Sequence, residues 1–277
     1  MAIRFDHKPG LVVYLTAGDP SIGSTREIAL AAIDAGADVI ELGVPFSDPL
    51  ADGPVIQRAM ERALARGDGL KGIRLKDVIQ LAREIRAARP QAGLVIFSYL
   101  NPILRYGLAK FADDAKAAGV DGVLAIDMIV EEADEYLAEM GRVDLAPIFL
   151  AAPTSPDARL EAIAAHTKGF VYAISRTGIT GTQQSVAGDA AALVERIRRF
   201  TGVAGAGLPV AVGFGISNAE HVAQVAEFAD AAVIGSAIVE LIERATPETA
   251  PDAVARFITS IFGDKVPSLE TAKAASP

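Results

Sequence analysis

The feature that most constrains the fold is the alternation of short apolar runs with helix-like segments along the whole chain of 277 residues. The runs contain little polar alternation, as expected for strands that are buried on both faces of a parallel sheet. Eight such strand–helix units without a break in composition predict one (β/α)8 barrel, because a doubly wound sheet more often has about five or six strands. The predicted strands are residues 11–18, 38–43, 93–99, 122–127, 144–152, 170–175, 209–215 and 231–236.

Helices are expected between these runs, and two of them end in a shared motif. Ala-Gly-Ala-Asp at residues 35–38 and Ala-Gly-Val-Asp at 118–121 place a glycine between a helix and the next strand. A glycine there ends the helix in a left-handed turn. We expect one domain over residues 1–264 and a poorly ordered tail over 265–277. The clearest helical segments are residues 25–35, 75–88, 108–118, 131–140 and 190–200.

The composition excludes several classes of protein. A net charge of −9 argues against binding to nucleic acids or anionic membranes, which requires basic patches. The absence of Cys excludes disulfides, thiolate metal sites and thiol nucleophiles, and is compatible with a reducing compartment. The N-terminal residues carry charges and a proline where a signal peptide has an apolar core, and no apolar run reaches the roughly 20 residues of a membrane span. We therefore expect a soluble protein of the cytoplasm.

Catalytic groups in a barrel of this kind come from the carboxyl ends of the strands. Glu41 lies there, within the otherwise apolar second run. A carboxylate in such a strand is costly to bury unless it is paired or protonated, and burial raises its pKa toward neutrality. This is the profile of a general acid–base residue. The alternative is a structural glutamate that a neighbouring hydroxyl or cation satisfies.

The loop after this run, residues 44–57, holds two more carboxylates, Asp48 and Asp52, together with three prolines and Gly53. Long loops after barrel strands are usually functional or mobile. Taken alone, each aspartate is explained better by turn chemistry. Asp52 could also cap the helix that is expected to begin near Pro54.

Glycine-bearing turns follow the last three runs, at residues 175–181, 213–217 and 234–237. Phosphate sites of these barrels lie after the last strands, where a helix N-terminus and glycine N–H groups can approach an anion. Glycines can also merely turn a strand into a helix, but two such turns on consecutive strands favour a phosphate site. Since no Lys or Arg lies in the last two turns, backbone amides would hold the anion. Ser236 would add a hydroxyl at the start of the last helix.

The positions of other residues exclude several reaction types. A Schiff-base aldolase needs a lysine near a strand end, whereas the lysines fall in helices, tails or loops that precede strands. His7, His166 and His221 are interpreted as surface or helix residues, and no cluster of His and carboxylates suggests a metal. Carboxylate acid–base catalysis on a phosphorylated substrate remains.

Ordered motifs along nearly the whole chain resemble the tryptophan synthase α subunit family. The most specific motif is ELGVPFSDPLADGPVIQ at residues 41–57, whereas GFGIS alone would not separate this family from other phosphate-binding barrels. The further motifs are TAGDP (16–20), YLNPILRYG (99–107), IFLAAPTSPDARL (148–160), GFVYAISRTGITG (169–181), GFGIS (213–217) and IGSAIV (234–239).

The resemblance implies a retro-aldol cleavage of indole-3-glycerol phosphate to indole and glyceraldehyde 3-phosphate, the penultimate step of L-tryptophan biosynthesis. Glu41 would take the 3′-hydroxyl proton and deliver a proton to indole C3. Asp52 would accept a hydrogen bond from the indole N–H and stabilise positive charge on the ring. Glu41 then needs a pKa near neutrality, while Asp52 stays ionised. Tyr172 would help to position Glu41, and Thr180 would contact Asp52 when its loop closes.

The same resemblance assigns binding residues and a partner, and it implies no metal or cofactor in this chain. The partner would be a β subunit that carries pyridoxal phosphate, in an α2β2 complex through which indole passes. It would meet segments 46–53, 99–107 and 177–181. The phosphate would be held by Gly181, Gly215, Gly235 and Ser236. The indole pocket would be lined by Tyr14, Ile56, Tyr99, Leu100 and Phe214, each of which could instead be barrel core.

The sequence departs from the family at Met128 and Ile129, where Leu-Pro is usual, and this concerns the rigidity of that turn and the contact with the partner. Residues 67–74 form a slightly longer segment than usual.

Three other functions are compatible with parts of this pattern: a different phosphate-binding barrel such as a sugar-phosphate isomerase, a non-catalytic module that only activates a β subunit, and a stand-alone indole-forming lyase. The ELG and LADGP motifs argue against the first, and intact Glu41 and Asp52 against the second.

Overall fold

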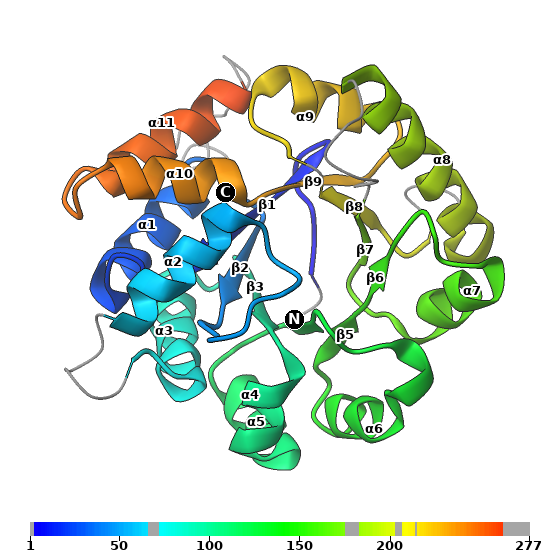
Figure 1. The fold of residues 1–277 in the computed structure, drawn as a ribbon, viewed down its shortest axis with the longest axis horizontal. Coiled ribbons are helices and arrows are strands. Elements are labelled where there is room, and N and C mark those ends of the chain that lie inside the picture. The colour runs from blue at the N-terminus through cyan, green and yellow to red at the C-terminus, as the bar shows by residue number, and fades with distance from the viewer. Residues whose placement is uncertain (1–2, 66–71, 175–182, 203–206, 214, 263–277) are drawn as a thin grey trace, which may run out of the picture.

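The computed structural model describes residues 3–65, 72–174, 183–202, 207–213 and 215–262, without the side chains of 183–187. Its strands form a ring that helices enclose (Figure 1). Neighbouring strands of the sheet are parallel in every described pair. The strands are β1 (Gly10–Thr16), β2 (Val39–Gly43), β3 (Gly93–Ser98), β4 (Gly122–Ala125), β5 (Ala146–Ile148), β6 (Leu150–Ala151), β7 (Val171–Ile174), β8 (Val210–Gly213) and β9 (Ala231–Ile234).

The fifth predicted strand closes the ring, but it is split in two. β5 and β6 are separated only by Phe149, and they stand at the two ends of the sheet order β5-β4-β3-β2-β1-β9-β8-β7-β6. β5 pairs with β4, and on its other side Tyr172 N donates to Phe149 O at 3.1 Å. The nine strands therefore correspond to the eight predicted ones, and the (β/α)8 barrel is confirmed. The prediction of one continuous strand is wrong at Phe149, whose ring packs edge-on against Tyr136 in the outer core.

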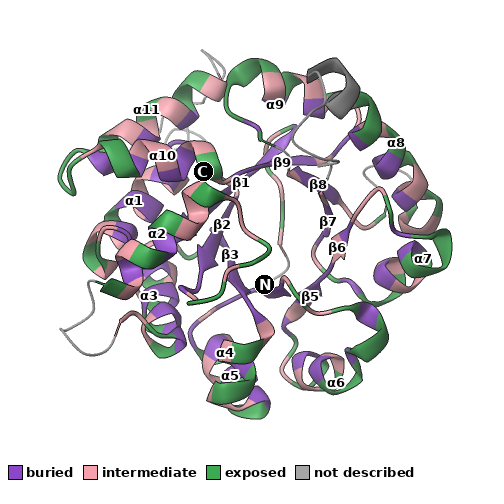
Figure 2. Ribbon diagram, in the orientation of Figure 1, coloured by how far each residue is buried: buried purple, intermediate pink, exposed green. Residues whose placement is uncertain are grey.

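The helices cover the outside of the ring, so the strands are almost wholly buried (Figure 2). The helix predicted at 131–140 begins instead with a 3-10 turn, and α10 is followed by a further helix, so Ser236 does not begin the last one. Within the described ranges, no helix is long and apolar enough to cross a membrane. The helices are α1 (Ile22–Asp34), α2 (Pro54–Ala65), α3 (Leu75–Ala88), α4 (Leu100–Tyr106), α5 (Leu108–Ala117), η1 (Val130–Glu132), α6 (Asp134–Arg142), α7 (Asp157–His166), α8 (Gln183–Thr201), α9 (Ala219–Ala226), α10 (Ser236–Arg244) and α11 (Ala250–Phe262).

Alternation along the strands separates two cores. On β1, Val12 and Tyr14 belong to the cluster inside the barrel, whereas Leu11, Val13 and Leu15 pack against the helices. The same period of two holds on the other strands, because successive side chains of a strand point to opposite faces. An inward-facing residue near a carboxyl end therefore points toward the mouth of the barrel.

At the amino end of the barrel, aspartates tie strands together. Asp38, just before β2, accepts a hydrogen bond from Leu11 N of β1 at 2.7 Å. Asp121, just before β4, accepts one from Leu94 N of β3 at 2.9 Å, and Asp230, just before β9, accepts one from the first residue of β8 at 2.9 Å. The glycines two residues before Asp38 and Asp121 have φ of 113° and 82°, so the predicted left-handed helix ends are confirmed.

Candidate active site

Glu41 points into the barrel from the middle of β2. Its neighbours Ile40 and Leu42 face the helices, so alternation turns Glu41 inward beside Tyr14, its register partner on β1. The side chain is fully buried, and neither carboxyl oxygen has a hydrogen-bond partner in the described part of the chain. This burial raises the pKa of Glu41 from 4.5 to about 8. A carboxyl group with such a pKa can both give and take a proton near neutrality.

A cavity of about 290 Å³ lies at the carboxyl ends of the strands. Glu41 does not line it, but Tyr14 and Tyr172 do. Burial, and after it the charges of Glu41 and Asp52, raise the pKa of the Tyr172 hydroxyl, so Glu41 lies within electrostatic reach of the cavity wall. The wall is mostly apolar with few polar groups, as in sites for small molecules. The lining residues are Tyr14, Ala51, Asp52, Gly53, Ile56, Phe97, Ile126, Leu150, Tyr172, Ile174 and Gly235.

Asp52 is held at this wall by Tyr99. The Tyr99 hydroxyl donates to Asp52 Oδ2 at 2.7 Å and accepts from Ala51 N at 3.0 Å. The Tyr99 ring packs on Phe46, with ring centroids 4.8 Å apart. Burial raises the pKa of Asp52, while the hydrogen bond from Tyr99 opposes this rise. The carboxylate is thus directed to Tyr99, a role different from the helix cap considered above, and Oδ1 is available to a donor in the cavity.

The N-terminus of α10 meets the same cavity. Gly235, which lines it, comes directly before Ser236, the first residue of α10. The first N–H groups of a helix have no intrahelical partner and attract anions. Gly215 has φ of 46°, in the left-handed region that favours glycine, in the turn after β8. The described residues include no group of three or more His, Asp or Glu that could hold a metal ion.

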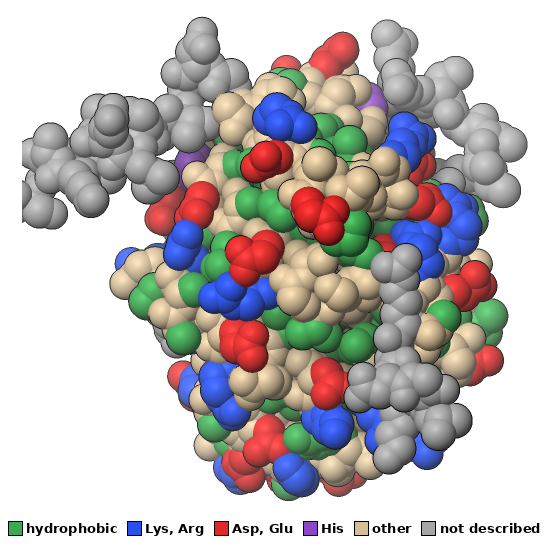
Figure 3. All heavy atoms as spheres, turned by 90° about the vertical axis from the view of Figure 1, so that its left-hand side faces the viewer, with side chains coloured by type: hydrophobic (Ala, Val, Ile, Leu, Met, Phe, Trp, Pro, Cys, Tyr) green, Lys and Arg blue, Asp and Glu red, His purple; other side chains and the backbone are tan. Residues whose placement is uncertain are grey.

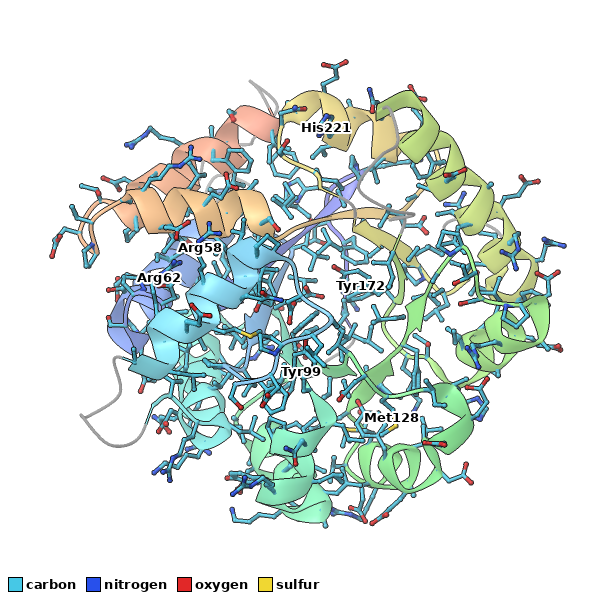
Figure 4. All side chains as sticks on the ribbon, viewed as in Figure 1. Arg58, Arg62, Tyr99, Met128, Tyr172 and His221 are labelled. Carbon is cyan, nitrogen blue, oxygen red and sulfur yellow. The ribbon has the colours of Figure 1, made fainter. Side chains whose placement is uncertain are left out.

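Two glycines make room for the tyrosines of the cavity wall. A Cβ added to Gly43 of β2 would overlap the Tyr14 hydroxyl, and one added to Gly213 of β8 would lie 2.7 Å from the Tyr172 hydroxyl. Each glycine stands on the strand next to that of its tyrosine. Tyr172 lies inside the ring of strands (Figure 4). Both tyrosine side chains therefore extend across a neighbouring strand. The absence of a side chain at the two glycines leaves room for the tyrosine hydroxyl groups.

The structure brings only some of the predicted site residues to one wall. Those that line the cavity are Tyr14, Asp52, Ile56, Tyr172 and Gly235. The others that are described lie close by or elsewhere: Glu41 inside the barrel, Tyr99 bonded to Asp52, Ser236 at the start of α10, Gly215 in the exposed turn after β8, and Leu100 at the start of α4, where its N–H donates to Asp127 Oδ1 at 2.7 Å. Three predicted residues lie outside the described residues: Thr180, Gly181 and Phe214.

Four apolar residues of the wall are not among the predicted site residues: Phe97, Ile126, Leu150 and Ile174. Each stands two residues after an inward-facing residue of the same strand or strand end. The period of two, extended past each predicted strand centre, would have found them.

This chain is similar in sequence and in fold to known proteins. The sequence model described as "Tryptophan synthase alpha chain" matches residues 2–263. A tryptophan synthase alpha chain from Solibacter usitatus is 48% identical over 87% of this chain and 86% of its own length. The crystal structure of the subunit alpha from Legionella pneumophila has a TM-score of 0.81 at 36% identity, covering 91% of this chain and 90% of the other. A chain in the tryptophan synthase complex from Pyrococcus furiosus has a TM-score of 0.81 at 37% identity, covering 92% and 98%. This chain belongs to the tryptophan synthase alpha chain family.

Proposed function

We propose that this cavity is where the chain carries out the reaction of its family, with Glu41 as the acid–base and Asp52 as the group that holds the indole N–H. As a tryptophan synthase alpha chain, the protein is a carbon–carbon lyase that cleaves indole-3-glycerol phosphate into indole and glyceraldehyde 3-phosphate. One observation carries the assignment of roles. Glu41 is fully buried, has no hydrogen-bond partner among the described residues, and has a pKa of about 8 beside the cavity.

The role of Glu41 follows from what makes indole a leaving group. The bond between indole C3 and carbon 3′ of the side chain breaks when C3 carries a proton, since its electrons can then return to the ring. A protonated Glu41 supplies this proton, and it regains one from the 3′-hydroxyl as that carbon becomes the aldehyde. Since Glu41 does not line the cavity, its side chain or the tyrosine rings beside it have to shift when substrate binds.

Asp52 has the opposite duty. Protonation at C3 leaves the ring with positive charge at its nitrogen, and an ionised carboxylate beside the N–H stabilises that charge. Tyr99 donates to Oδ2 of Asp52 and so fixes the direction in which Oδ1 is presented. The mechanism therefore requires a protonated Glu41 and an ionised Asp52. Their surroundings differ accordingly, since Glu41 has no hydrogen-bond partner among the described residues, whereas Asp52 accepts from Tyr99.

The phosphate of the substrate is assigned to the N-terminus of α10. Gly235 and the Ser236 backbone and hydroxyl would bind it, with Gly215 and Gly181 completing the site. Helix N–H groups hold the anion through their dipoles, so the chain's net charge of −9 does not oppose binding. With indole at Asp52 and phosphate at α10, the substrate would span the cavity.

The partner of the alpha chain is a β subunit that carries pyridoxal phosphate and receives the indole. We place its contact at the carboxyl end of this barrel. Among the described residues, the large apolar side chains that are exposed are Leu50 (90%), Leu104 (53%) and Ile129 (44%). They follow β2, β3 and β4, so they surround the same barrel end as the cavity. Exposed apolar residues gathered at one end are typical of an interaction surface. We place both subunits in the cytoplasm, where a chain without Cys is compatible with reducing conditions.

The test is indole release from indole-3-glycerol phosphate with and without β subunit. We expect slow release by the chain alone and faster release with the partner. Asp52→Asn should lower the rate on the order of a hundredfold or more, because the ring loses its counter-charge. Asp113→Asn, which removes an exposed aspartate of α5, is the matched control and should keep the wild-type rate. Full activity of Asp52→Asn would refute the assigned role, and equal rates with and without partner would favour a stand-alone lyase.

A further inference from the structure

A chain of ion pairs joins α2 to α10. Arg62 of α2 donates to both carboxylate oxygens of Asp19, at 2.9 and 2.7 Å, and its remaining nitrogen donates to Glu243 of α10 at 2.7 Å. Arg58 donates to both oxygens of Glu243, at 3.0 and 2.9 Å. Both arginines lie on the side of α2 that faces α10 (Figure 4). We call these four residues the α2–α10 clamp.

The clamp connects the two helices that carry the two halves of the proposed site. α2 follows directly after Asp52 and Gly53, and α10 begins beside Gly235. Near the cavity the helices meet through apolar atoms, with Ile56 Cδ1 3.8 Å from where a Cβ of Gly235 would lie. Apolar contact is non-directional and allows sliding. The paired guanidinium–carboxylate bonds of the clamp fix both distance and direction.

Burial at Asp19 distinguishes the clamp from an ordinary surface ion pair. The side chain of Asp19 is 3% exposed, whereas those of Arg62, Glu243 and Arg58 are 25%, 29% and 48% exposed. The bidentate pair of Arg62 with Asp19 is therefore the costly one to break, and it holds the Arg62 guanidinium in the direction of Glu243. Hydrogen bonds from Arg58, and the charge of Arg62, lower the pKa of Glu243 to about 2, so the clamp stays charged near neutrality. Elsewhere on this side of the molecule, acidic and basic side chains are interspersed (Figure 3).

We propose that Arg62, Asp19 and Glu243 are positioning residues. They fix the distance between Asp52, in the loop that precedes α2, and the N-terminus of α10. They thereby set the length of ligand that the site can hold at both ends. Arg62 lies about 12 Å along α2 from its first residue, at about 1.5 Å per residue, so it acts through the helix and does not touch the substrate. Asp19 follows β1 and anchors the clamp to the barrel wall. This inference rests on the proposed function, in which the two ends hold indole and phosphate.

The experiment compares one linked ligand with its two separate halves. The linked ligand is 3-(indol-3-yl)propyl phosphate, which lacks the 3′-hydroxyl and cannot be cleaved, and the halves are indole and inorganic phosphate. The variants are Glu243→Gln, which removes the shared carboxylate, and Arg62→Lys, which keeps the charge but loses the planar fork. The matched control is Arg244→Gln, because Arg244 of α10 pairs at 3.3 Å with Glu240 of the same helix and not with α2.

Loosening the clamp should weaken the linked ligand alone. In both variants we expect its dissociation constant to rise on the order of tenfold, while those of indole and phosphate change by less than about twofold. Arg244→Gln should bind all three like the wild type. The inference is overturned if the linked ligand binds as before, or if all three weaken together with a lower melting temperature, which is what a merely structural role predicts. Failure of the proposed function would look different: Ser236→Ala would then leave phosphate affinity of the wild-type scaffold unchanged.

Discussion

The aspartates at the amino end of the barrel and Glu41 inside it are all buried, but they differ in their hydrogen-bond partners. At the amino end, Asp38 and Asp121 are each 3% exposed and fully engaged, Asp121 with Arg86 at 2.6 Å and with Leu94 N at 2.9 Å. Inside the barrel, in the middle of β2, Glu41 is buried at least as deeply, yet neither of its oxygens has a partner in the described part of the chain. Burial is therefore common to Glu41 and to these aspartates. The difference in partners separates a carboxyl group that holds strands together from one that can react.

This difference has an energetic meaning. A buried carboxylate with charged or backbone donors is compensated, so it can hold neighbouring strands in register. A buried carboxyl group without partners avoids the cost of desolvation by keeping its proton, and so remains an acid near neutral pH. The amino-end aspartates hold neighbouring strands rigidly together, and this rigid barrel tolerates the Glu41 carboxyl group, which has no partner among the described residues. Five expected outcomes test this contrast.

The largest effect is expected from Glu41→Gln. Cleavage should fall on the order of a thousandfold, because the amide can neither give nor take the proton. The melting temperature should not fall, since the glutamine replaces a group that is itself neutral at pH 7. Indole release and thermal unfolding measure the two effects. Near-full activity of this variant would remove Glu41 from the mechanism.

The same residue should make stability depend on pH. Burial raises the pKa of Glu41 from 4.5 in its ordinary state to about 8 in the fold. Between these values the folded protein keeps a proton that the unfolded chain has released. The contribution of Glu41 to the unfolding free energy is thus fully present below about pH 4.5, falls by up to a few kcal/mol as pH rises to about 8, and then levels off. Urea unfolding of wild type and Glu41→Gln between pH 5 and 9 isolates this effect. A stability difference that grew in favour of wild type at higher pH would contradict it.

The matching change at the amino end should affect stability and spare the chemistry. Asp121→Asn removes the charge that faces Arg86, whose guanidinium side chain is 18% exposed. We expect a loss of about 2 to 3 kcal/mol of unfolding free energy, because the amide oxygen can still accept from Arg86 but no longer carries the negative charge that compensates the largely buried guanidinium. Cleavage per folded molecule should stay near wild type. An inactive but stable variant would mean that the two ends are not separable in this way.

The sequence can predict those features of the molecule whose causes lie within a few neighbouring residues. Glu41 stands out because a carboxylate in an apolar strand is visible in a short window of sequence. Asp52 does not, since turn chemistry alone explains an aspartate in that loop, and its role is predicted only through the family resemblance. Strand ends were less well predicted. The run at 11–18 reads as continuous, but β1 ends at Thr16 because Gly18 adopts φ of 91°. Likewise α1 begins at Ile22, before the predicted start, because Ser21 caps it by accepting from Ser24 N.

Features that depend on tertiary contacts escaped prediction. Nothing near Arg62 in the sequence shows that it faces Asp19 and Glu243, since many arginines of this chain lie on helices. The break of the fifth strand at Phe149 depends on packing in the outer core. Such contacts are set by which helix faces meet, and this is fixed only when the barrel closes.

A smaller effect is expected from alanine at the two glycines that leave room for tyrosine hydroxyl groups. Gly213→Ala would place a methyl group 2.7 Å from the Tyr172 hydroxyl, and Gly43→Ala would crowd Tyr14 in the same way. Neither glycine has the left-handed φ that would penalise alanine by itself. We expect a loss of about 1 to 2 kcal/mol of stability from overpacking, together with slower cleavage as the ring shifts on the cavity wall. Unchanged kcat and KM in both variants would show that the positions of the rings do not matter.

The smallest effect is expected from Gly141→Ala, which serves as the control for those two substitutions. A Cβ at Gly141 would meet nothing within 4 Å, and the residue lies in the last turn of α6, exposed to solvent. Alanine should therefore stabilise the fold by about 0.5 kcal/mol through helix propensity, with no change in cleavage. If Gly141→Ala and Gly213→Ala lowered activity alike, the effect at Gly213 would come from losing backbone freedom. If only Gly213→Ala lowers activity, the cause is the contact with Tyr172, and Gly213 is required because it leaves room for the Tyr172 hydroxyl at the cavity wall.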